Sequence, residues 1–266
     1  MDEGKYNSTC LCAVMEGNTE VTPPPVYEFS YSPELGLLMD HLDEVAFECD
    51  GKDLLALASN KIQQERRNAV FNPYPVGKVS RGKLDVNYGF LNEYLYESQD
   101  YAPHKLLKAR RTICGFEIYS LDQDAEEYVG CLRSNILGTK YSLEQNDQKV
   151  VEIRYLTSVF KRRGPREFSV LFMGMAESTG KPIVMRNKEP YYNVETNSYS
   201  LNFNGRVTTP SVKNFQLVHP LDPTYVTLTF GKVSRYKYIL DYAYPWTGVQ
   251  AFAIALTALD YKIGCD

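Results

Sequence analysis

Two basic clusters are the parts of this 266-residue chain best suited to bind a charged ligand. They consist of Lys105, Lys108, Arg110 and Arg111, and of Lys161, Arg162, Arg163 and Arg166. Clustered cations can contact membrane phosphates or nucleic acid, whereas a solvated strand face or an exposed turn is the simpler interpretation. The sequence alone leaves both interpretations open.

Residues that could catalyse a reaction or ligate a metal form no recognisable motif. The three histidines lack metal-ligand spacing, and the pair Cys10-x-Cys12 has no further ligands beside it. We find no nucleophile elbow, phosphate-cradling glycine loop or paired-carboxylate signature. The acidic run Asp122–Glu127 lacks the glycine and the terminal glutamate spacing of a calcium loop. We therefore expect no catalytic residue, no metal and no cofactor.

Charge is distributed unevenly along the chain. Residues 1–69 carry 13 acidic and 5 basic side chains, a balance of −8, whereas residues 70–266 carry 20 acidic and 24 basic ones, a balance of +4. The six scattered cysteines fit free thiols in a reducing compartment. No secretory signal and no apolar run long enough to span a bilayer is recognisable. The second region is therefore the better candidate for an anionic partner.

The acidic region is predicted to be partly disordered and partly helical. Residues 1–30 are polar and proline-containing. Apolar residues recur at helical spacing over residues 33–48, with an acidic outer face, and a second helix is predicted from about Asp53 to Arg67. The prolines after Asn72 then interrupt the pattern. We place the domain boundary here, with residues 1–69 as the N-terminal region and residues 70–266 as a second domain.

The second domain is predicted to be mainly β-structure. Aromatic and β-branched runs alternate with turn residues such as Asn204-Gly205 and His219-Pro220. These runs are Tyr88–Tyr96, Thr112–Leu121, Lys149–Phe160, Glu167–Phe172, Tyr199–Phe203, Asn214–Val218, Tyr225–Phe230 and Tyr236–Tyr242. Many short strands without intervening helices indicate an antiparallel barrel or sandwich.

One helix, predicted from about Pro245 to Tyr261, is apolar on every face. Only Gln250 and Thr257 are polar between Gly248 and Leu259. A surface helix would carry one apolar stripe and one charged face. The segment is too short to span a membrane, so protein must surround it. We expect it to fill the lumen of the barrel, which also argues against an enzyme that uses that lumen.

Three stretches together resemble a known family. Residues 203–216 read FNGRVTTPSVKNFQ, residues 128–141 read YVGCLRSNILGTKY, and residues 251–266 read AFAIALTALDYKIGCD. With Gly164-Pro165-Arg166, they resemble the C-terminal domain of the tubby family over roughly residues 75–266. The resemblance implies a closed antiparallel barrel of about twelve strands around one central C-terminal helix, so α+β by content but mainly β.

The resemblance also implies a function. Tubby-like domains are non-enzymatic, membrane-associated adaptors that bind phosphoinositide headgroups, chiefly the 4,5-bisphosphate, and several carry membrane cargo into cilia. A Lys-Leu-Arg segment supplies two headgroup cations in that family. In this chain Arg133 matches the arginine, whereas Cys131 occupies the lysine position. The family asparagine aligns at about Phe116 and its second arginine at about Asp147.

These departures predict weaker binding. Two lost cations, one of them replaced by a negative charge, would weaken headgroup binding by about 3–6 kcal/mol, or about 10²–10⁴-fold. Lys149, Arg110 and Arg111 are the candidates to compensate, together with Arg133. A purely structural role for Arg133 is the alternative interpretation.

Two functions therefore remain open. The first is an adaptor at inner-leaflet phosphoinositides, cytoplasmic and peripheral at the plasma or ciliary membrane. The alternative is a protein-interaction or transcription-linked scaffold that has lost lipid binding, with the helix over residues 33–48 as its partner surface and the nucleus as a further location. Nucleic acid is not expected as the primary ligand.

Overall fold

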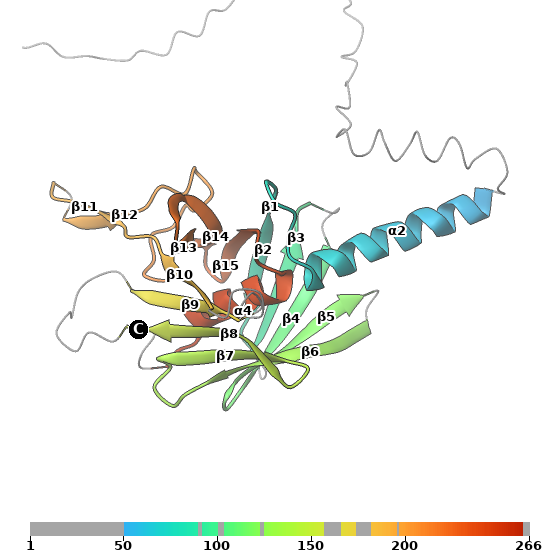
Figure 1. Ribbon diagram of the computed structural model, residues 1–266, viewed down its shortest axis with the longest axis horizontal. Coiled ribbons are helices and arrows are strands. Elements are labelled where there is room, and N and C mark those ends of the chain that lie inside the picture. Colours follow the sequence, from blue (N-terminus) through green and yellow to red (C-terminus); the bar gives the residue numbers. More distant parts are fainter. Residues whose placement is uncertain are drawn as a thin grey trace, which may run out of the picture. The chain divides into compact units, whose positions relative to one another are not determined.

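Twelve antiparallel strands close into a barrel around one helix in the computed structural model (Figure 1). The structure describes residues 51–89, 92–100, 104–122, 125–156, 166–173, 182–195 and 197–262. The predicted helix over residues 33–48, the polar segment 1–30 and the basic run 161–163 lie outside the described residues. The predicted fold class is confirmed.

Each barrel strand pairs with its neighbour in the chain. The barrel strands are β2 Gly82–Asn87, β3 Glu93–Ser98, β4 His104–Thr112, β5 Gly115–Asp122, β6 Ala125–Ser134, β7 Lys140–Gln145, β8 Gln148–Tyr155, β9 Phe168–Phe172, β10 Ile183–Asn187, β13 Phe215–His219, β14 Asp222–Ser234 and β15 Lys237–Ala243. A separate hairpin of β11 Tyr191–Asn193 and β12 Ser198–Ser200 interrupts this order between β10 and β13.

Strand β15 closes the barrel. It pairs with β14 on one side and with β2 on the other, where Ile239 lies opposite Lys83. The short strand β1 Val79–Ser80 continues the β2 side and pairs with the same edge of β15. Closure satisfies the backbone groups that an open sheet would expose at its edges.

Alternating burial along the strands directs apolar side chains into the lumen. In β9, Phe168, Val170 and Phe172 are buried, and the residues between them are partly exposed. In β3, the buried positions are Tyr94, Tyr96 and Ser98. This period of two is the reason why the barrel has one apolar inner face and one polar outer face.

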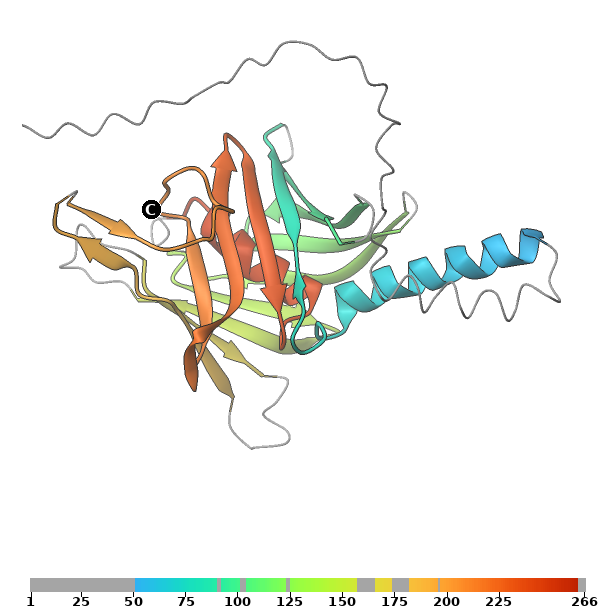
Figure 2. The same ribbon diagram turned by 90° about the horizontal axis from the view of Figure 1, so that it is seen from above.

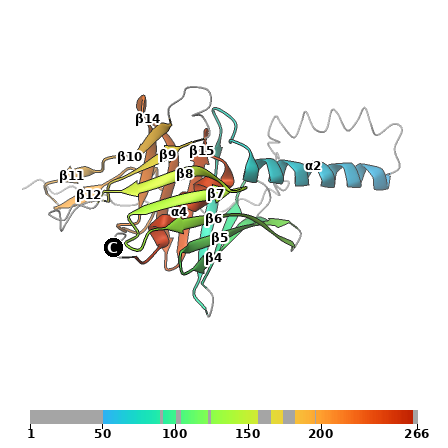
Figure 3. The same ribbon diagram turned by 60° about the horizontal axis from the view of Figure 1, so that its bottom comes forward.

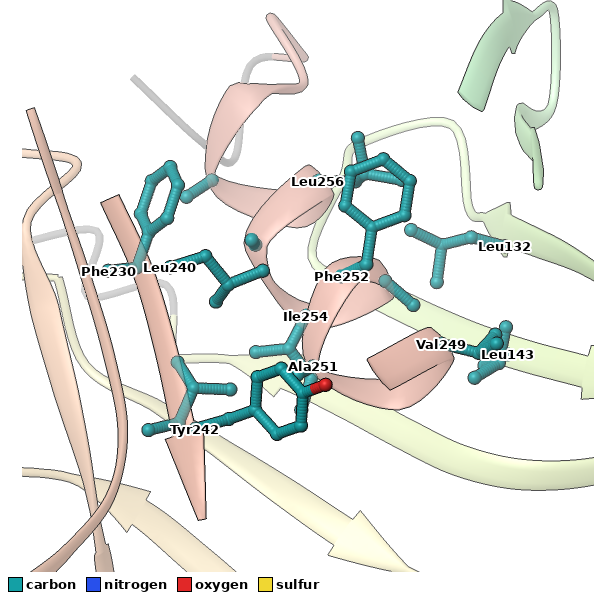
Figure 4. Close-up of a cluster of buried hydrophobic side chains, with 14 of the residues drawn as sticks. Leu132, Leu143, Phe230, Leu240, Tyr242, Val249, Ala251, Phe252, Ile254 and Leu256 are labelled. Carbon is teal, nitrogen blue, oxygen red and sulfur yellow. The ribbon is translucent and has the colours of Figure 1, made fainter. Parts of the chain in front are cut away.

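Helix α4, Gly248–Leu259, fills the lumen, and all twelve of its residues are buried. Phe252, Ile254 and Leu256 project from different sides of the helix toward the surrounding strands, as Figure 4 shows. Leu132 and Leu143 approach from one side of α4, whereas Phe230, Leu240 and Tyr242 approach from the other (Figure 4). Each such side chain contributes about 1.5–3 kcal/mol through its burial, so α4 and the barrel stabilise one another. Figure 2 shows the same enclosure from above.

The polar residues of α4 are satisfied where the helix begins and ends. Thr247 and Gln250 form a reciprocal capping box. Helix α4 therefore begins at Gly248, and the predicted start at Pro245 is wrong by three residues. Thr257 bonds the Ile254 carbonyl at 2.7 Å and the Tyr155 hydroxyl at 2.7 Å.

A second helix, α2, spans Gly51–Phe71 and confirms the helix predicted over residues 53–67, with four more residues at its end. Its last turn packs against the start of α4, where a Cβ on Gly248 would lie 2.8 Å from the Ala69 carbonyl oxygen. Tyr242 donates a hydrogen bond to the same carbonyl. A compact unit begins at Ala56; the domain boundary near residue 70 stays a prediction.

The predicted strands correspond to β3, β5, β8, β9, β13, β14 and β15, with shifted ends. Two predictions were wrong in detail. Residues 88 and 89 precede β3 rather than belonging to it, and Tyr199–Phe203 contributes only to the hairpin strand β12, outside the barrel. Trp246 is buried beside Phe172 and donates to the Thr227 hydroxyl at 3.0 Å.

Among the described residues, no helix is both long and apolar enough to cross a bilayer.

Candidate functional site on the outer face of the barrel

Arg133 lies on the outer face of β6, and its side chain is 60% exposed. Its Nε donates a 2.7 Å hydrogen bond to Oε2 of Glu144 on β7. This hydrogen bond raises the pKa of Arg133. The opposite residue on β5 is Gly115, where a Cβ would clash with the Leu132 carbonyl oxygen at 1.8 Å. Because the Arg133 side chain is 60% exposed, its guanidinium is accessible to a ligand, but it already has Glu144 as a carboxylate partner.

Two of the predicted cations share one row across the outer face. Residues directly opposite each other on antiparallel strands present their side chains on the same face. The row runs through Arg110, Glu117, Cys131, Glu144 and Lys149, from β4 to β8. Figure 3 brings these strands forward as neighbours. Charges of opposite sign thus alternate on either side of Cys131.

Cys131, at the position that the resemblance assigns to lysine, lies between two carboxylates. Its Cα partners are Glu117 and Glu144, and its Sγ lies 3.8 Å from Oε2 of Glu144. Arg133 offsets only one of these negative charges. The surface around Cys131 therefore disfavours the binding of a phosphate, because its carboxylates repel an anion.

A stronger positive centre lies beside it, on β7 and β8. Lys140, Lys149 and Arg154 converge on the carboxylate of Glu152, at 3.3, 3.0 and 2.5 Å. Burial alone would raise the pKa of Glu152, but hydrogen bonds from Lys149, Arg154 and Lys140 outweigh it and lower the pKa to about 2. Three positive charges and one negative charge leave the cluster at +2. We call these four residues the Glu152 cluster.

The Glu152 cluster adjoins Arg133. Ser142 on β7 is the Cα partner of both Arg133 on β6 and Glu152 on β8. Neighbouring strands lie about 4.8 Å apart, so Arg133 and Glu152 are two strand spacings, or about 10 Å, from each other. A headgroup with several phosphates could contact both.

Arg111 does not belong to this surface. It lies on the inner face, opposite the buried Phe116, and its Nη2 contacts Oδ1 of Asp260 at 2.7 Å. Asp260 is 1% exposed and also accepts a hydrogen bond from the Tyr141 hydroxyl. The interpretation of Arg111 as a headgroup residue is therefore corrected: it neutralises a buried carboxylate just beyond α4.

The other two aligned positions also lie away from Arg133. Phe116 faces the core and is 1% exposed. Asp147 sits in the β7–β8 turn, where Asn146 and Asp147 have positive φ values of 49° and 59°. It is five residues beyond Ser142, which corresponds to about 16 Å along a strand. Neither residue can take the place of a headgroup ligand beside Arg133.

Lys108 and Arg110 of the first cluster are paired with carboxylates on neighbouring strands. Nζ of Lys108 contacts Glu93 at 2.6 Å and Glu126 at 3.1 Å, and Arg110 contacts Glu126 at 2.6 Å while it stacks on Tyr119. This network forms a solvated outer face of β3 to β6, as the simpler interpretation predicted. Arg110 thus lies on the outer face, as a headgroup ligand would, but its guanidinium is already paired with Glu126.

Apolar turns flank the Glu152 cluster at one end of the barrel. Ile113 is 95% exposed and Ile136 is 92% exposed, and Leu137 and Leu156 are also exposed. Backbone hydrogen bonds from Ser134 to Cys114 and from Tyr155 to Thr139 bring these turns together. Lys140 and Arg154 stand at the same strand ends. Cations and apolar side chains together are suited to a charged interface with an apolar layer beneath it.

We did not predict Lys140, Arg154 or the apolar turns from the sequence. The signal for Arg154 was present, because Ile153 and Tyr155 alternate with it in β8. Lys149 required the structure: strict alternation from Val151 would place it inside, but a register shift between Leu143 and Glu144 places it outside.

Comparisons with known proteins agree with this architecture. The model of the Tub family matches residues 175–261. Over 245 residues, the chain is 34% identical to Protein king tubby of Drosophila sechellia, a match that covers 74% of this chain and 55% of that protein. The chain is 32% identical to Tubby-related protein 3 of Homo sapiens over 251 residues, which covers 74% of this chain and 57% of that protein. The chain belongs to the tubby-like family.

This tubby-like chain spans about half the length of the curated relatives that it matches. Within it, several residues of the 203–216 stretch hold the fold together. Arg206 forms two hydrogen bonds with Asp241, at 2.5 and 2.9 Å, and Asn214 bonds the backbone of Thr209 and Lys232. Through these contacts, residues of the characteristic motif stabilise the fold independently of any ligand.

Proposed function

We propose that this tubby-like domain is a non-enzymatic adaptor that docks on phosphoinositide-containing membranes through the outer face of β6 to β8. The supporting observation is the Glu152 cluster, with its net charge of +2, beside exposed apolar turns. Each cation near an anionic leaflet contributes about 1 kcal/mol to attraction. The family suggests phosphatidylinositol 4,5-bisphosphate as the headgroup.

Binding would use hydrogen-bond donors of the lysine and arginine side chains that Glu152 and Glu144 do not occupy. The ammonium groups of Lys140 and Lys149 each carry three N–H donors, of which Glu152 engages one. Their free donors and those of Arg133 can contact phosphate oxygens. Meanwhile Ile136 and Leu137 can enter the acyl boundary below the headgroups. Placement at the cytoplasmic side of the plasma or ciliary membrane, with a role in the delivery of membrane proteins to cilia, is part of this proposal.

Co-sedimentation with vesicles tests the proposal. We expect more binding to vesicles that contain phosphatidylinositol 4,5-bisphosphate than to vesicles of neutral lipid. Lys140→Gln with Arg154→Gln should weaken the binding by about 10- to 100-fold. Arg81→Gln with Lys83→Gln removes the same charge from β2 and its flank and serves as the control. Equal binding to both vesicles, or equal losses in the two double variants, would contradict the proposal.

A second candidate function is a protein-interaction or transcription-linked scaffold that has lost lipid binding. The two carboxylates beside Cys131 favour it. It predicts capture of a partner by the helix expected over residues 33–48, in the cytoplasm or the nucleus. Leu38→Asp with Leu42→Asp should then abolish capture in a pull-down, whereas the vesicle results should be negative throughout.

A further inference from the structure

Arg166 is an unexplained charge outside the candidate site. It precedes β9, and its Nε, Nη1 and Nη2 are all buried without a hydrogen-bond partner among the described residues. A buried charge without a partner is costly, because it has lost its hydration and gained nothing in exchange. Such a group in a native protein calls for an acceptor that the described residues do not provide.

Arg166 lines an open cleft of about 1010 Å³. Tyr192 and Tyr199 of the β11–β12 hairpin, which projects from one side of the barrel in Figure 1, line the same cleft. Lys188 and Lys213 line the same cleft, and none of its described lining residues is an aspartate or glutamate. Arg110, Arg133 and the cations of the Glu152 cluster all meet carboxylates, whereas the described lining of the cleft holds three cations and no carboxylate. Its volume is typical of a site for a small molecule.

Neighbouring strand ends bring these cations together. The Asn187 side chain donates to the Arg166 carbonyl at 2.9 Å and accepts from the Phe168 amide at 2.9 Å, which fixes the start of β9 against the end of β10. Lys188 follows directly and its amide bonds to the Gln216 carbonyl of β13. The backbone around Arg166 is thus anchored even though its guanidinium is not.

The third cation already has a role. Nζ of Lys213 donates to the Ala258 carbonyl at 3.1 Å and lies over the Tyr261 ring. It therefore satisfies the end of α4, and Arg166 is the better anchor for an anion.

The walls of the cleft add apolar and hydroxyl surface. Tyr155, Phe168, Phe203 and Phe215 contribute rings, and Thr208 and Ser211 contribute hydroxyls. Residues of the 203–216 stretch therefore both support the fold and line this cleft. A guanidinium beside aromatic walls matches a ligand that joins an oxyanion to an aromatic body.

We infer that the cleft binds a small anionic molecule whose phosphate or carboxylate pairs with Arg166 and whose aromatic body lies against the ring walls. The inference is independent of membrane docking, because the cleft shares no lining residue with the Glu152 cluster. The guanidinium N–H groups of Arg166 can bind either a phosphate or a carboxylate, so the experiment must distinguish these two ligands.

Thermal unfolding of the full chain with phenyl phosphate, benzoate or inorganic phosphate is the test. Binding to the folded state raises the unfolding temperature in proportion to occupancy. We expect a saturable rise with phenyl phosphate or benzoate at millimolar concentration, and a smaller one with inorganic phosphate. The aromatic probe with the larger rise identifies the oxyanion. No rise with either aromatic probe would overturn the inference.

Two variants distinguish a binding role from a structural one. Arg166→Gln should weaken titrated binding of the effective probe by about 10- to 100-fold. Arg166→Met should leave the unfolding temperature without ligand unchanged or higher, because it removes an unpartnered buried charge. Lys188→Gln should weaken probe binding and leave the fold intact. Arg133→Gln should not change probe binding at all. Unaltered probe binding in Arg166→Gln, or marked destabilisation of Arg166→Met, would overturn the inference.

Discussion

The inner and outer faces of the barrel treat neighbouring arginines in opposite ways. Arg110 faces outward, where solvent shares its contacts with Glu126, whereas Arg111 faces inward and meets Asp260, which is 1% exposed. The same residue type is thus a replaceable surface charge at one position and part of the buried structure at the next. Inner-face changes should therefore alter stability, and outer-face changes should alter binding.

The largest effect is expected at the centre of the inner face. Phe252→Ala removes a fully buried ring that packs near Tyr96 and leaves a cavity inside a closed barrel. We expect the free energy of unfolding to fall by about 3–5 kcal/mol. Denaturant titration measures it. A loss below about 1 kcal/mol would mean that the lumen can collapse around α4.

The two arginines give a matched pair of variants. Arg111→Gln leaves Asp260 buried without its cation and should cost about 3 kcal/mol, at the low end for a buried ion pair because Arg111 is itself 28% exposed. Arg110→Gln should cost less than about 1 kcal/mol. The same denaturant titration compares them. Similar costs would erase the distinction between the two faces.

The apolar turns test whether the outer face meets a membrane. Ile136→Ser with Leu137→Ser changes exposed side chains, so stability should stay within about 0.5 kcal/mol. If both side chains enter the acyl boundary, their loss should weaken vesicle binding by about 10-fold or more. Vesicle co-sedimentation measures this. Val76→Ser with Leu221→Ser, also exposed but outside the candidate site, is the control.

Glu152 should affect both vesicle binding and stability. Glu152→Gln raises the charge of its cluster from +2 to +3 and should strengthen vesicle binding severalfold, while it loses three ion pairs. Because the pKa of Glu152 is lowered to about 2 in the folded state, its stabilising contribution is complete above about pH 4.5 and disappears as the pH falls toward 2. The stability difference between the wild type and Glu152→Gln should therefore shrink over that interval. A constant difference would show that the ion pairs contribute nothing.

Much of the fold followed from local pattern. The all-apolar segment around Phe252 required an enclosing structure, and the runs of alternating residues supplied strands to enclose it. The start of helix α4 was less predictable, because Pro245 suits a first helical turn as well as a preceding loop. The capping box of Thr247 and Gln250 decided the start.

The candidate site was predicted only in part. Arg133 and Lys149 were identified, and both lie on the outer face. Arg111 was misplaced because β4 carries no clear alternation around Leu106 and Leu107, which are both buried. Arg154 was overlooked because a single charge within an apolar strand resembles any solvated position.

The sequence by itself determined the family, the β-rich barrel and the buried helix, because these depend on long motifs and on hydrophobic periodicity. Only the tertiary structure decided which cations act together. A one-residue change of register moves a side chain to the other face of a strand, and the shift beside Leu143 moved Lys149 outward. Charges far apart in the chain, such as Arg111 and Asp260, or Arg166 and Lys188, acquire their roles only when strand pairing brings them together.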